Sequence, residues 1–248
     1  MPEGQSSLDL LEIWESLMPS LSIDCVVFGF HDGQLKVLAL KLKNTEQYAL
    51  PGGFVRKDES VNEAAHRVLR DRTGLTDIFL EQFYVFGERE RGDQRVHQEV
   101  FRANGVEIPD DHWLFQRFVS LGYYALVDFS KVRSTPDWLS ESCDWHDHRD
   151  LPPMILDHNA IVTKALETLR LMLDHKLVGF NLLPEKFTMG ELQQLYETIL
   201  DKELVRSNFQ RKMLSLGIFE RLEKKMTGAA NKAPYLYRVE LNTLRNKD

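Results

Sequence analysis

One stretch of 24 residues, from Gly52 to Leu75, constrains this chain more than any other. It begins with two glycines after a Leu-Pro pair, continues as an amphipathic run and ends near Gly74. A glycine directly after such a run is the usual residue at a helix C-terminus, because it adopts a positive φ without strain. The stretch therefore predicts a loop, a helix with one buried face, and a second loop. The apolar positions of the helix are Val61, Ala64, Ala65, Val68 and Leu69.

The spacing within this stretch resembles that of a known catalytic motif. Counted from Gly53, Glu59 lies six residues on, Arg67 fourteen, Gly74 twenty-one and Leu75 twenty-two. These offsets are similar to those of the Nudix box, the loop–helix–loop signature of hydrolases that act on nucleoside diphosphates linked to another group. The resemblance implies a Nudix domain, which is an α/β/α sandwich.

The acidic positions of that motif are changed here. The family has a glutamate directly after its arginine and two more three and four residues later, whereas this chain has Val68, Asp71 and Arg72. In the family these carboxylates share a helix face and converge on magnesium. A cation at position 72 would repel such an ion by about 8 kcal/mol at 4 Å and an effective dielectric near 20. We expect no catalytic residues, no resident metal and no cofactor; a weak ion held by Glu59, Glu63 and Asp71 is the alternative.

Composition narrows the class of protein. The 248 residues are 43% hydrophobic and 28% charged, which is typical of a folded, water-soluble chain. Cys25 and Cys143 are too few for a disulfide framework. There is no run of 18 uncharged apolar residues, and the N-terminus lacks the features of a signal peptide. We therefore expect a cytoplasmic protein that does not interact with membranes.

The segments around the box favour a strand-rich domain with an insertion. A short helix is predicted over Ser7–Leu17 and a longer one over Asn159–His175. The charged segment Arg89–Arg117 contains an isolated apolar cluster, and we interpret it as a partly helical lid, a mobile segment or a surface insertion without a role. Strands are predicted over Ile23–Phe30, Leu35–Leu42, Ile78–Gly87 and Phe118–Phe129.

A second module begins near residue 179, so we divide the chain into residues 1–178 and 179–248. Thr188 and Glu191 have the spacing of a capping box and introduce a helix over Met189–Leu200. A second helix follows over Ser207–Ser215, with Phe209 on its inner face. Two strands with a lysine-containing loop then complete a winged helix-turn-helix; they are predicted over Ile218–Glu223 and Tyr235–Leu241. The predicted fold class of the whole chain is α+β.

Positive charge is concentrated in this second module, although the formal net charge of the chain is −7. Between Arg206 and Arg238 there are 8 Lys and Arg residues against 2 Asp and Glu residues. Local cations neutralise DNA phosphates, and side chains such as Asn208 and Arg211 read base edges in the major groove. Solvated surface charges or contacts with a partner protein are the alternatives. The predicted DNA-binding residues are Arg206, Ser207, Asn208, Arg211, Lys212, Lys224, Lys225 and Lys232.

A Nudix domain joined to a winged helix resembles the Nudix-related transcriptional regulators of the NrtR type. The resemblance rests on short matches in order, among them Val26–Phe30, Leu50–Val55, Asp58–Ser60, Tyr123–Leu126, Leu156–His158, Leu192–Gln193, Leu195–Glu197 and Asn208–Phe209. It implies a homodimer on a palindromic operator in double-stranded DNA, and a degenerate Nudix pocket that binds an effector. The effector is ADP-ribose in one branch and a pentose such as arabinose in another. The segments Arg67–Leu69 and Gly179–Pro184 look closer to the second branch.

The resemblance also places candidate effector contacts in the former substrate pocket. They are Gly52, Gly53, Phe54 and Tyr124, with Asp157 or Arg89 as polar partners. Family members have about twenty fewer residues where this chain has the 89–117 insertion. Two other functions remain open: a diverged hydrolase acting on ADP-ribose-like substrates, and an adaptor whose winged module contacts a protein.

Overall fold

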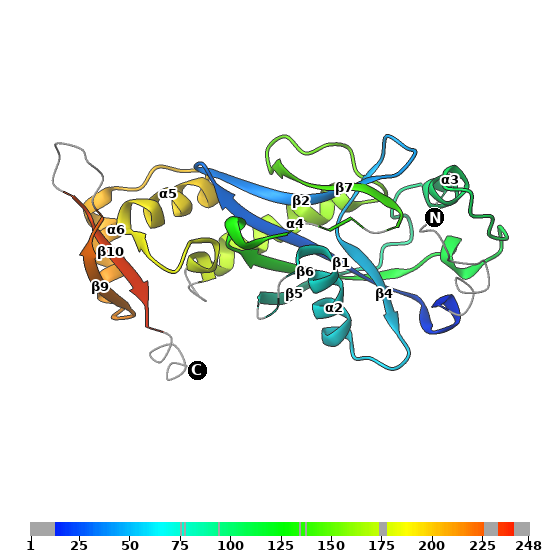
Figure 1. The fold of residues 1–248 in the computed structure, drawn as a ribbon, viewed down its shortest axis with the longest axis horizontal. Coiled ribbons are helices and arrows are strands. Elements are labelled where there is room, and N and C mark those ends of the chain that lie inside the picture. Colours follow the sequence, from blue (N-terminus) through cyan, green and yellow to red (C-terminus); the bar gives the residue numbers. More distant parts are fainter. Residues whose placement is uncertain are drawn as a thin grey trace.

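The computed structural model describes residues 13–74, 76, 78–93, 95–133, 135–136, 138–173, 178–225 and 233–240. The molecule is elongated, with a large sheet-containing body at one end and a smaller helical unit with its own sheet at the other (Figure 1). The predicted α+β fold class, a sandwich followed by a winged helix, is confirmed.

The body is built on a seven-stranded mixed sheet. Five strands follow the order β3-β2-β1-β6-β5, while β4 pairs with β1 and β7 pairs with β2. The long strand β1 is central: it runs parallel to β6 and antiparallel to β2 and β4. The strands are β1 (Leu17–His31), β2 (Gln34–Leu42), β3 (Tyr48–Ala49), β4 (Gly52–Arg56), β5 (Phe79–Phe86), β6 (Val119–Val127) and β7 (Ser140–Asp147).

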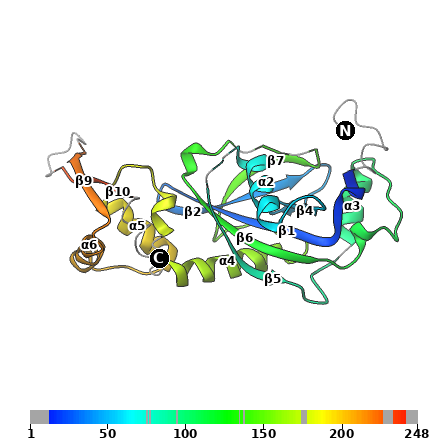
Figure 2. The same ribbon diagram turned by 90° about the horizontal axis from the view of Figure 1, so that it is seen from below.

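A helix covers each face of this sheet, as Figures 1 and 2 show. Successive residues of β6 point to opposite faces, so Tyr123 joins one core cluster and Tyr124 the other. Helix α2 (Val61–Thr73) packs Val68 and Leu69 on the first face. Helix α4 (His158–Met172) packs its apolar residues on the second. The three-layer sandwich follows from this alternation.

Local signals in the sequence fix the ends of α2. The Ser60 hydroxyl accepts from the backbone of Glu63, and the Glu63 carboxylate accepts from the backbone of Ser60 at 2.7 Å, which forms a capping box. Gly74 ends the helix in the left-handed region, with φ 69°. Such caps each stabilise a helix by about 1 kcal/mol. The helix predicted within the 52–75 stretch is confirmed.

The other predicted elements of the body are confirmed in part, and some of them differ from the structure. Most of the helix predicted over Ser7–Leu17 lies outside the described residues; residues 13–15 are helical, and β1 begins at Leu17. The insertion contains helix α3 (Arg95–Ala103) and the 3-10 turn η1 (Trp113–Phe115), so its partly helical character is confirmed. The last predicted strand ends at Val127 and is followed by the turn η2 (Phe129–Lys131). Strand β7 was not predicted.

The smaller unit is a winged helix. Its helices α5 (Met189–Leu200) and α6 (Arg206–Ser215) and its strands β9 (Phe219–Lys224) and β10 (Tyr235–Val239) confirm the predicted elements to within two residues at each end. A short strand, β8 (Phe187–Thr188), pairs with β10 and was not predicted. The turn η3 (Val178–Leu182) leads into the unit.

The two units share one hydrophobic core. Apolar residues of the sheet, α4, α5 and α6 belong to a single buried cluster. Arg170 Nε of α4 donates to the carbonyl of Ile199 on α5 at 2.7 Å, and Thr198 Oγ1 donates to the carbonyl of Gly33 in the β1–β2 turn at 3.1 Å. The winged unit is therefore attached to both α4 and the β1–β2 hairpin.

Candidate functional site

A pocket of about 180 Å³ opens beside β4, at the edge of the sandwich. Three of the predicted effector residues, Gly52, Gly53 and Phe54, line it. A Cβ atom at position 52 would lie 2.8 Å from Asp24 Oδ1 and from the carbonyl of Ile23. Glycine therefore lets β4 pass close to β1 at the floor of the pocket.

The other predicted effector residues lie elsewhere. Arg89 is exposed and does not line this pocket. Tyr124 is fully buried in the core on the α4 side; its ring packs against Phe79, and its hydroxyl donates to Glu81 Oε2 at 3.3 Å. Asp157 is next in sequence to the lining residue His158, and its carboxylate is bound to another arginine.

That arginine is Arg91, two residues from the one that the sequence suggested. Its Nε and Nη2 donate to the two carboxylate oxygens of Asp157 at 2.9 and 2.8 Å. Its Nη2 also lies 3.5 Å from Asp24 Oδ2, which in turn accepts a hydrogen bond from Ser120. The Arg91 side chain is 1% exposed. A bidentate pair of this kind fixes geometry as well as charge.

The backbone around Arg91 is shaped to reach this position. Gly92 has φ 93°, and a Cβ there would lie 2.8 Å from Leu156 Cα. The chain can therefore pass tightly over the segment that precedes α4. Asp157 occupies the N-cap position of α4 but makes no capping hydrogen bond. Its carboxylate instead ties the insertion to the start of the helix.

His158 lies between β3 and β1. Its Nδ1 accepts a hydrogen bond from the backbone N–H of Leu50 at 3.0 Å, so the proton of the neutral ring is on Nε2. That nitrogen is 3.6 Å from Asp24 Oδ1. Burial lowers the pKa of His158 below its ordinary value, against the opposing effect of Asp24. The ring is therefore neutral at pH 7, and its Nε2, which carries the proton, lies beside the Asp24 carboxylate.

The insertion forms one wall of the pocket. Helix α3 contributes His97, Val100 and Phe101 to the lining, and Phe118 follows the insertion. The Arg91 guanidinium lies 5.1 Å from the centre of the Phe118 ring, and the His97 ring lies 5.8 Å from it. Burial lowers the pKa of His97 to about 4. The segment left open as a lid or a passive insertion therefore borders the pocket directly.

The residues of the changed box do not fit a divalent cation. Glu59 Oε1 is 2.6 Å from the Arg67 guanidinium, and Glu63 caps α2. Asp71 is exposed, 3.6 Å from Arg70. Arg72 lines the pocket. Within the described part of the chain, no group of three or more His, Cys, Asp or Glu side chains is arranged to hold a metal ion.

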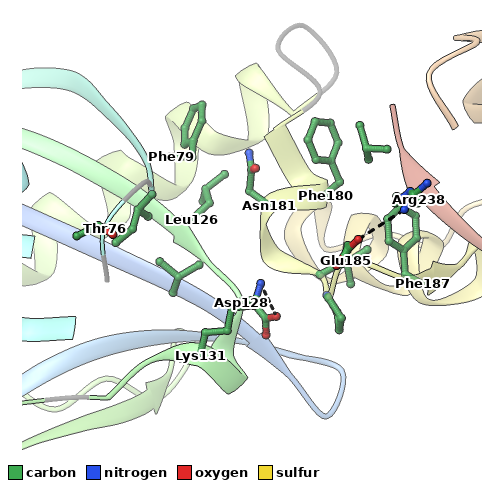
Figure 3. Close-up of a pocket in the computed structure, with 15 residues that line it drawn as sticks. Thr76, Phe79, Leu126, Asp128, Lys131, Phe180, Asn181, Glu185, Phe187 and Arg238 are labelled. Carbon is green, nitrogen blue, oxygen red and sulfur yellow. Dashed lines mark ion pairs between the residues drawn. The ribbon is translucent and has the colours of Figure 1, made fainter. Parts of the chain in front are cut away.

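A larger cleft of about 460 Å³ lies between the two units (Figure 3). Phe79 and Leu126 line it on the sandwich side, and Phe180 and Phe187 line it on the winged side. Each wall carries an ion pair of its own. Asp128 and Lys131 are 3.6 Å apart on the first wall, and Glu185 and Arg238 are 3.8 Å apart on the second. The charges of each wall are thus balanced within one unit.

The outer face of α6 carries the predicted DNA contacts. Phe209 and Met213 face inward and are buried. All five residues predicted on this helix are exposed: Arg206, Ser207, Asn208, Arg211 and Lys212. Arg211 Nη2 donates to Asn208 Oδ1 at 3.2 Å, so the two predicted base-reading side chains lie together. Figure 2 shows α6 at the end of the molecule opposite α3.

The predicted wing contacts are partly described. Lys224 and Lys225 at the end of β9 are exposed. Lys224 Nζ lies 5.5 Å from the ring centre of Tyr235, and Lys225 Nζ lies 2.6 Å from Glu191 Oε1. Lys232 is outside the described residues. In the described part of the chain, we find no helix with the length and apolar character needed to span a bilayer.

Comparison with known proteins places both units. Residues 18–166 match the family model described as NUDIX domain, and residues 179–239 match the NrtR DNA-binding winged helix domain. The chain is 30% identical over 231 residues to the ADPR responsive transcriptional repressor NtrR of Acinetobacter baylyi. The aligned residues cover 90% of this chain and 83% of that protein. It is 26% identical over 149 residues to the ADP-ribose pyrophosphatase of Methanocaldococcus jannaschii, covering 59% and 72% of the two chains.

A solved structure extends the similarity to the whole architecture. The crystal structure of Shewanella oneidensis NrtR superposes with a TM-score of 0.70 at 25% identity, covering 91% of this chain and 96% of that one. The order of the two units agrees with these matches, and α6 with its exposed cationic face lies within the part matched to the DNA-binding winged helix domain. The chain therefore belongs to the NrtR-type family of Nudix-related transcriptional regulators.

Proposed function

We propose that this protein is an effector-responsive transcriptional regulator, in which the Nudix pocket binds a sugar or nucleotide-sugar without hydrolysing it. The similarity to a repressor named for its response to ADP-ribose supports an ADP-ribose-like effector. A pentose is the second candidate, and the segments Arg67–Leu69 and Gly179–Pro184, which resemble the pentose-responsive branch, support it. The loss of a cation-binding carboxylate set at Val68 and Arg72 supports binding without turnover.

The observation that carries this proposal is the position of α4. The helix begins at His158, a pocket residue, and it ends against the winged unit. Arg170 near its C-terminus holds the carbonyl of Ile199, and the carbonyl of Leu173 accepts from the Tyr196 hydroxyl at 3.3 Å. Its 15 residues span about 22 Å. A change at the N-terminus of one rigid helix can therefore shift the DNA-binding unit at the other end.

The reading unit is α6 with its wing. We assign Arg206, Lys212, Lys224, Lys225 and Lys232 to phosphates, and Asn208 and Arg211 to base edges, with Ser207 beside them. We divide the chain at residues 178 and 179. Two copies would place their α6 helices about 34 Å apart on a palindromic operator. The homodimer is part of the proposal, and sedimentation of the complex with DNA would show two chains for each duplex.

The direct test is DNA binding with and without effector. Fluorescence anisotropy would follow a labelled duplex from the promoter upstream of the protein's own gene. We expect binding at low ionic strength, and a 5- to 150-fold change in Kd on adding ADP-ribose or L-arabinose, which corresponds to a coupling of about 1–3 kcal/mol. Absence of binding to this duplex and to promoter fragments from neighbouring genes would contradict the proposal.

A hydrolase is the second candidate function, and the match to an ADP-ribose pyrophosphatase favours it. Incubation of the pure protein with ADP-ribose and magnesium or manganese tests it. Turnover that Glu59→Gln abolishes would establish catalysis. Because Val68 and Arg72 stand where the family has metal-binding glutamates, we expect no turnover above a blank reaction.

A further inference from the structure

The strands of the wing hold their cations in two different ways. Arg238 Nη2 lies 2.6 Å from Glu220 Oε2, so its charge is paired. Arg221 and Lys224 are exposed, and among the described residues no carboxylate lies at ion-pair distance from either of them. Both lie against one tyrosine instead: the guanidinium carbon of Arg221 is 4.5 Å and Lys224 Nζ is 5.5 Å from the ring centre of Tyr235.

The pairing of β9 with β10 shows which way this cluster faces. Tyr235 lies opposite Lys224, and Tyr237 lies opposite Arg221. Residues directly opposite one another in an antiparallel pair project from the same face of the sheet. Tyr237 is buried in the core that includes α5 and α6, so this face is turned toward the two helices. Arg238 follows Tyr237 in the strand and therefore points to the other face.

A groove of about 210 Å³ joins the cluster to the helix that carries the predicted DNA contacts. Tyr235 and Tyr237 line this groove from the wing, and Arg206 and Gln210 line it from α6. Arg206 is exposed in the first turn of α6 and is one of the residues assigned above to phosphates. The exposed face of α6 therefore continues across the groove onto the strands of the wing.

The ring of Tyr235 leaves the donor groups of Arg221 accessible. A guanidinium stacks on an aromatic ring by its flat face, and its N–H groups point outward in its own plane. The contact therefore restricts the side chain without using its hydrogen bonds. Tyr235 is itself 36% exposed, so the stack lies at the surface. A planar fork of donors held at the surface matches a phosphate group, which it can bind through two hydrogen bonds.

We propose that Arg221 is a further DNA-contacting residue, that it binds a backbone phosphate beside the groove that α6 enters, and that Tyr235 is its positioning residue. The inference rests on the proposed function, because it requires a bound duplex. It extends the DNA-binding surface of the wing from the lysines at the end of β9 and in the following loop to the strands themselves. Because the contact is to a phosphate, it carries no sequence information.

Arg221→Ala tests the contact, and Arg238→Ala is the matched control. Both substitutions remove one exposed arginine from the same pair of strands, so they change the net charge equally while acting on opposite faces. Fluorescence anisotropy with the full-length protein measures Kd for the promoter duplex and for an unrelated duplex of equal length over a series of salt concentrations. Arg221→Ala should weaken binding to both duplexes by about 3- to 10-fold and reduce the slope of log Kd against log salt by about 0.9. Arg238→Ala should leave the slope unchanged.

Substitutions of Tyr235 test its positioning role. Tyr235→Phe keeps the stacked ring and should retain the wild-type affinity and slope. Tyr235→Leu removes the ring at unchanged net charge and should weaken binding to both duplexes. In the Arg221→Ala protein, Tyr235→Leu should have a smaller effect, because the side chain that the ring holds is absent. Thermal unfolding without DNA should give each variant a Tm within about 2 °C of wild type, since both side chains are exposed.

Four results would overturn the inference. Equal changes of slope in Arg221→Ala and Arg238→Ala would show a general effect of charge. An unchanged slope in Arg221→Ala would show that the guanidinium contacts no phosphate, as expected if this face binds an acidic protein instead. A loss confined to the promoter duplex would indicate a base contact, and full additivity of Tyr235→Leu and Arg221→Ala would exclude the positioning role. Failure of the wild type to bind either duplex contradicts the proposed function itself, and the inference is withdrawn with it.

Discussion

The pocket and the outer face of α6 use cationic side chains in opposite ways. Arg91, which pairs with the pocket residue Asp24 and with Asp157, is 1% exposed, whereas Arg206, Arg211 and Lys212 on α6 are all exposed. Breaking a buried pair leaves an uncompensated charge and is strongly unfavourable, whereas exposed charges contribute little to folding. The Arg91 charge therefore contributes to stability and shape beside the pocket, whereas the α6 cations lie on an exposed outer face.

This contrast predicts that the two regions can be altered separately. A substitution in the Arg91 cluster should reduce folding stability and change the effector site. A substitution on α6 should change DNA affinity and leave the free energy of unfolding unchanged. The two regions are connected through the apolar core that the two units share, which includes α4.

The largest effect is expected for Arg91→Met, which removes the charge and keeps the length of the side chain. Asp24 and Asp157 would then face one another without the guanidinium between them. We expect the free energy of unfolding to fall by about 3–5 kcal/mol and Tm by roughly 10 °C. Urea unfolding followed by circular dichroism measures the change.

Arg89→Met is the matched control for this prediction. Arg89 is exposed, so its loss should change stability by less than about 0.5 kcal/mol. Equal losses in the two variants would remove the contrast between buried and exposed arginines in the insertion.

The next effect concerns the pH dependence of stability. His97 has a folded pKa of about 4, whereas an unfolded histidine titrates near 6.5. Between these values the unfolded chain binds more protons, so stability is retained above pH 6.5 and lost as the pH falls toward 4. The contribution of His97 to this loss is about 3 kcal/mol at pH 4. Other buried histidines add to the total, and the difference between wild type and His97→Phe isolates this one.

Denaturant unfolding at pH 7 and pH 4 provides the measurement. The stability of His97→Phe relative to wild type should improve by about 3 kcal/mol between the two pH values. Parallel behaviour of the two proteins would mean that His97 is not buried as a neutral ring. The variant His66→Gln, which replaces an exposed histidine on α2, is measured in parallel as a control for the substitution itself.

The same contrast explains which features the sequence revealed. Local rules fix α2, with Ser60 and Glu63 as a capping box and Gly74 as the C-cap, and the same holds for α5 with Thr188 and Glu191. The outer face of α6 follows from helical periodicity once Phe209 is placed inward. These signals depend on residues within one or two turns of each other, so they can be read without a three-dimensional structure.

The pocket depends on contacts that no local pattern encodes. Arg91 meets Asp157 across 66 positions of sequence, and His158 meets Leu50 across 108. An arginine was expected near this place, but Arg89 and Arg91 cannot be distinguished without the path of the chain at Gly92. Asp24 within an apolar strand was the one available signal, because a carboxylate is rarely buried there without a charged partner.

On the DNA side, Arg211→Ala should weaken operator binding by about 1–3 kcal/mol, or 5- to 150-fold, if the guanidinium reads a guanine edge. It should also reduce discrimination between operator and unrelated DNA. Tm should stay within about 2 °C of wild type, since the side chain is exposed. Arg102→Ala, on the distant helix α3, is the control for loss of an exposed arginine. Unchanged operator affinity in Arg211→Ala would favour the adaptor alternative.

The smallest effect is expected for Lys224→Ala on the wing. A lysine that contacts one phosphate releases about one counterion, so its removal should reduce the slope of log Kd against log salt by about 0.9. It should also weaken binding to all DNA sequences by the same factor. Lys225→Ala is the sharper comparison, because Lys225 already pairs with Glu191 at 2.6 Å and must give up that partner to bind a phosphate. We therefore expect a smaller change of slope for Lys225→Ala. A larger change would mean that the Glu191 pair opens when DNA binds, and that an ion pair of the free protein does not predict which cations remain available.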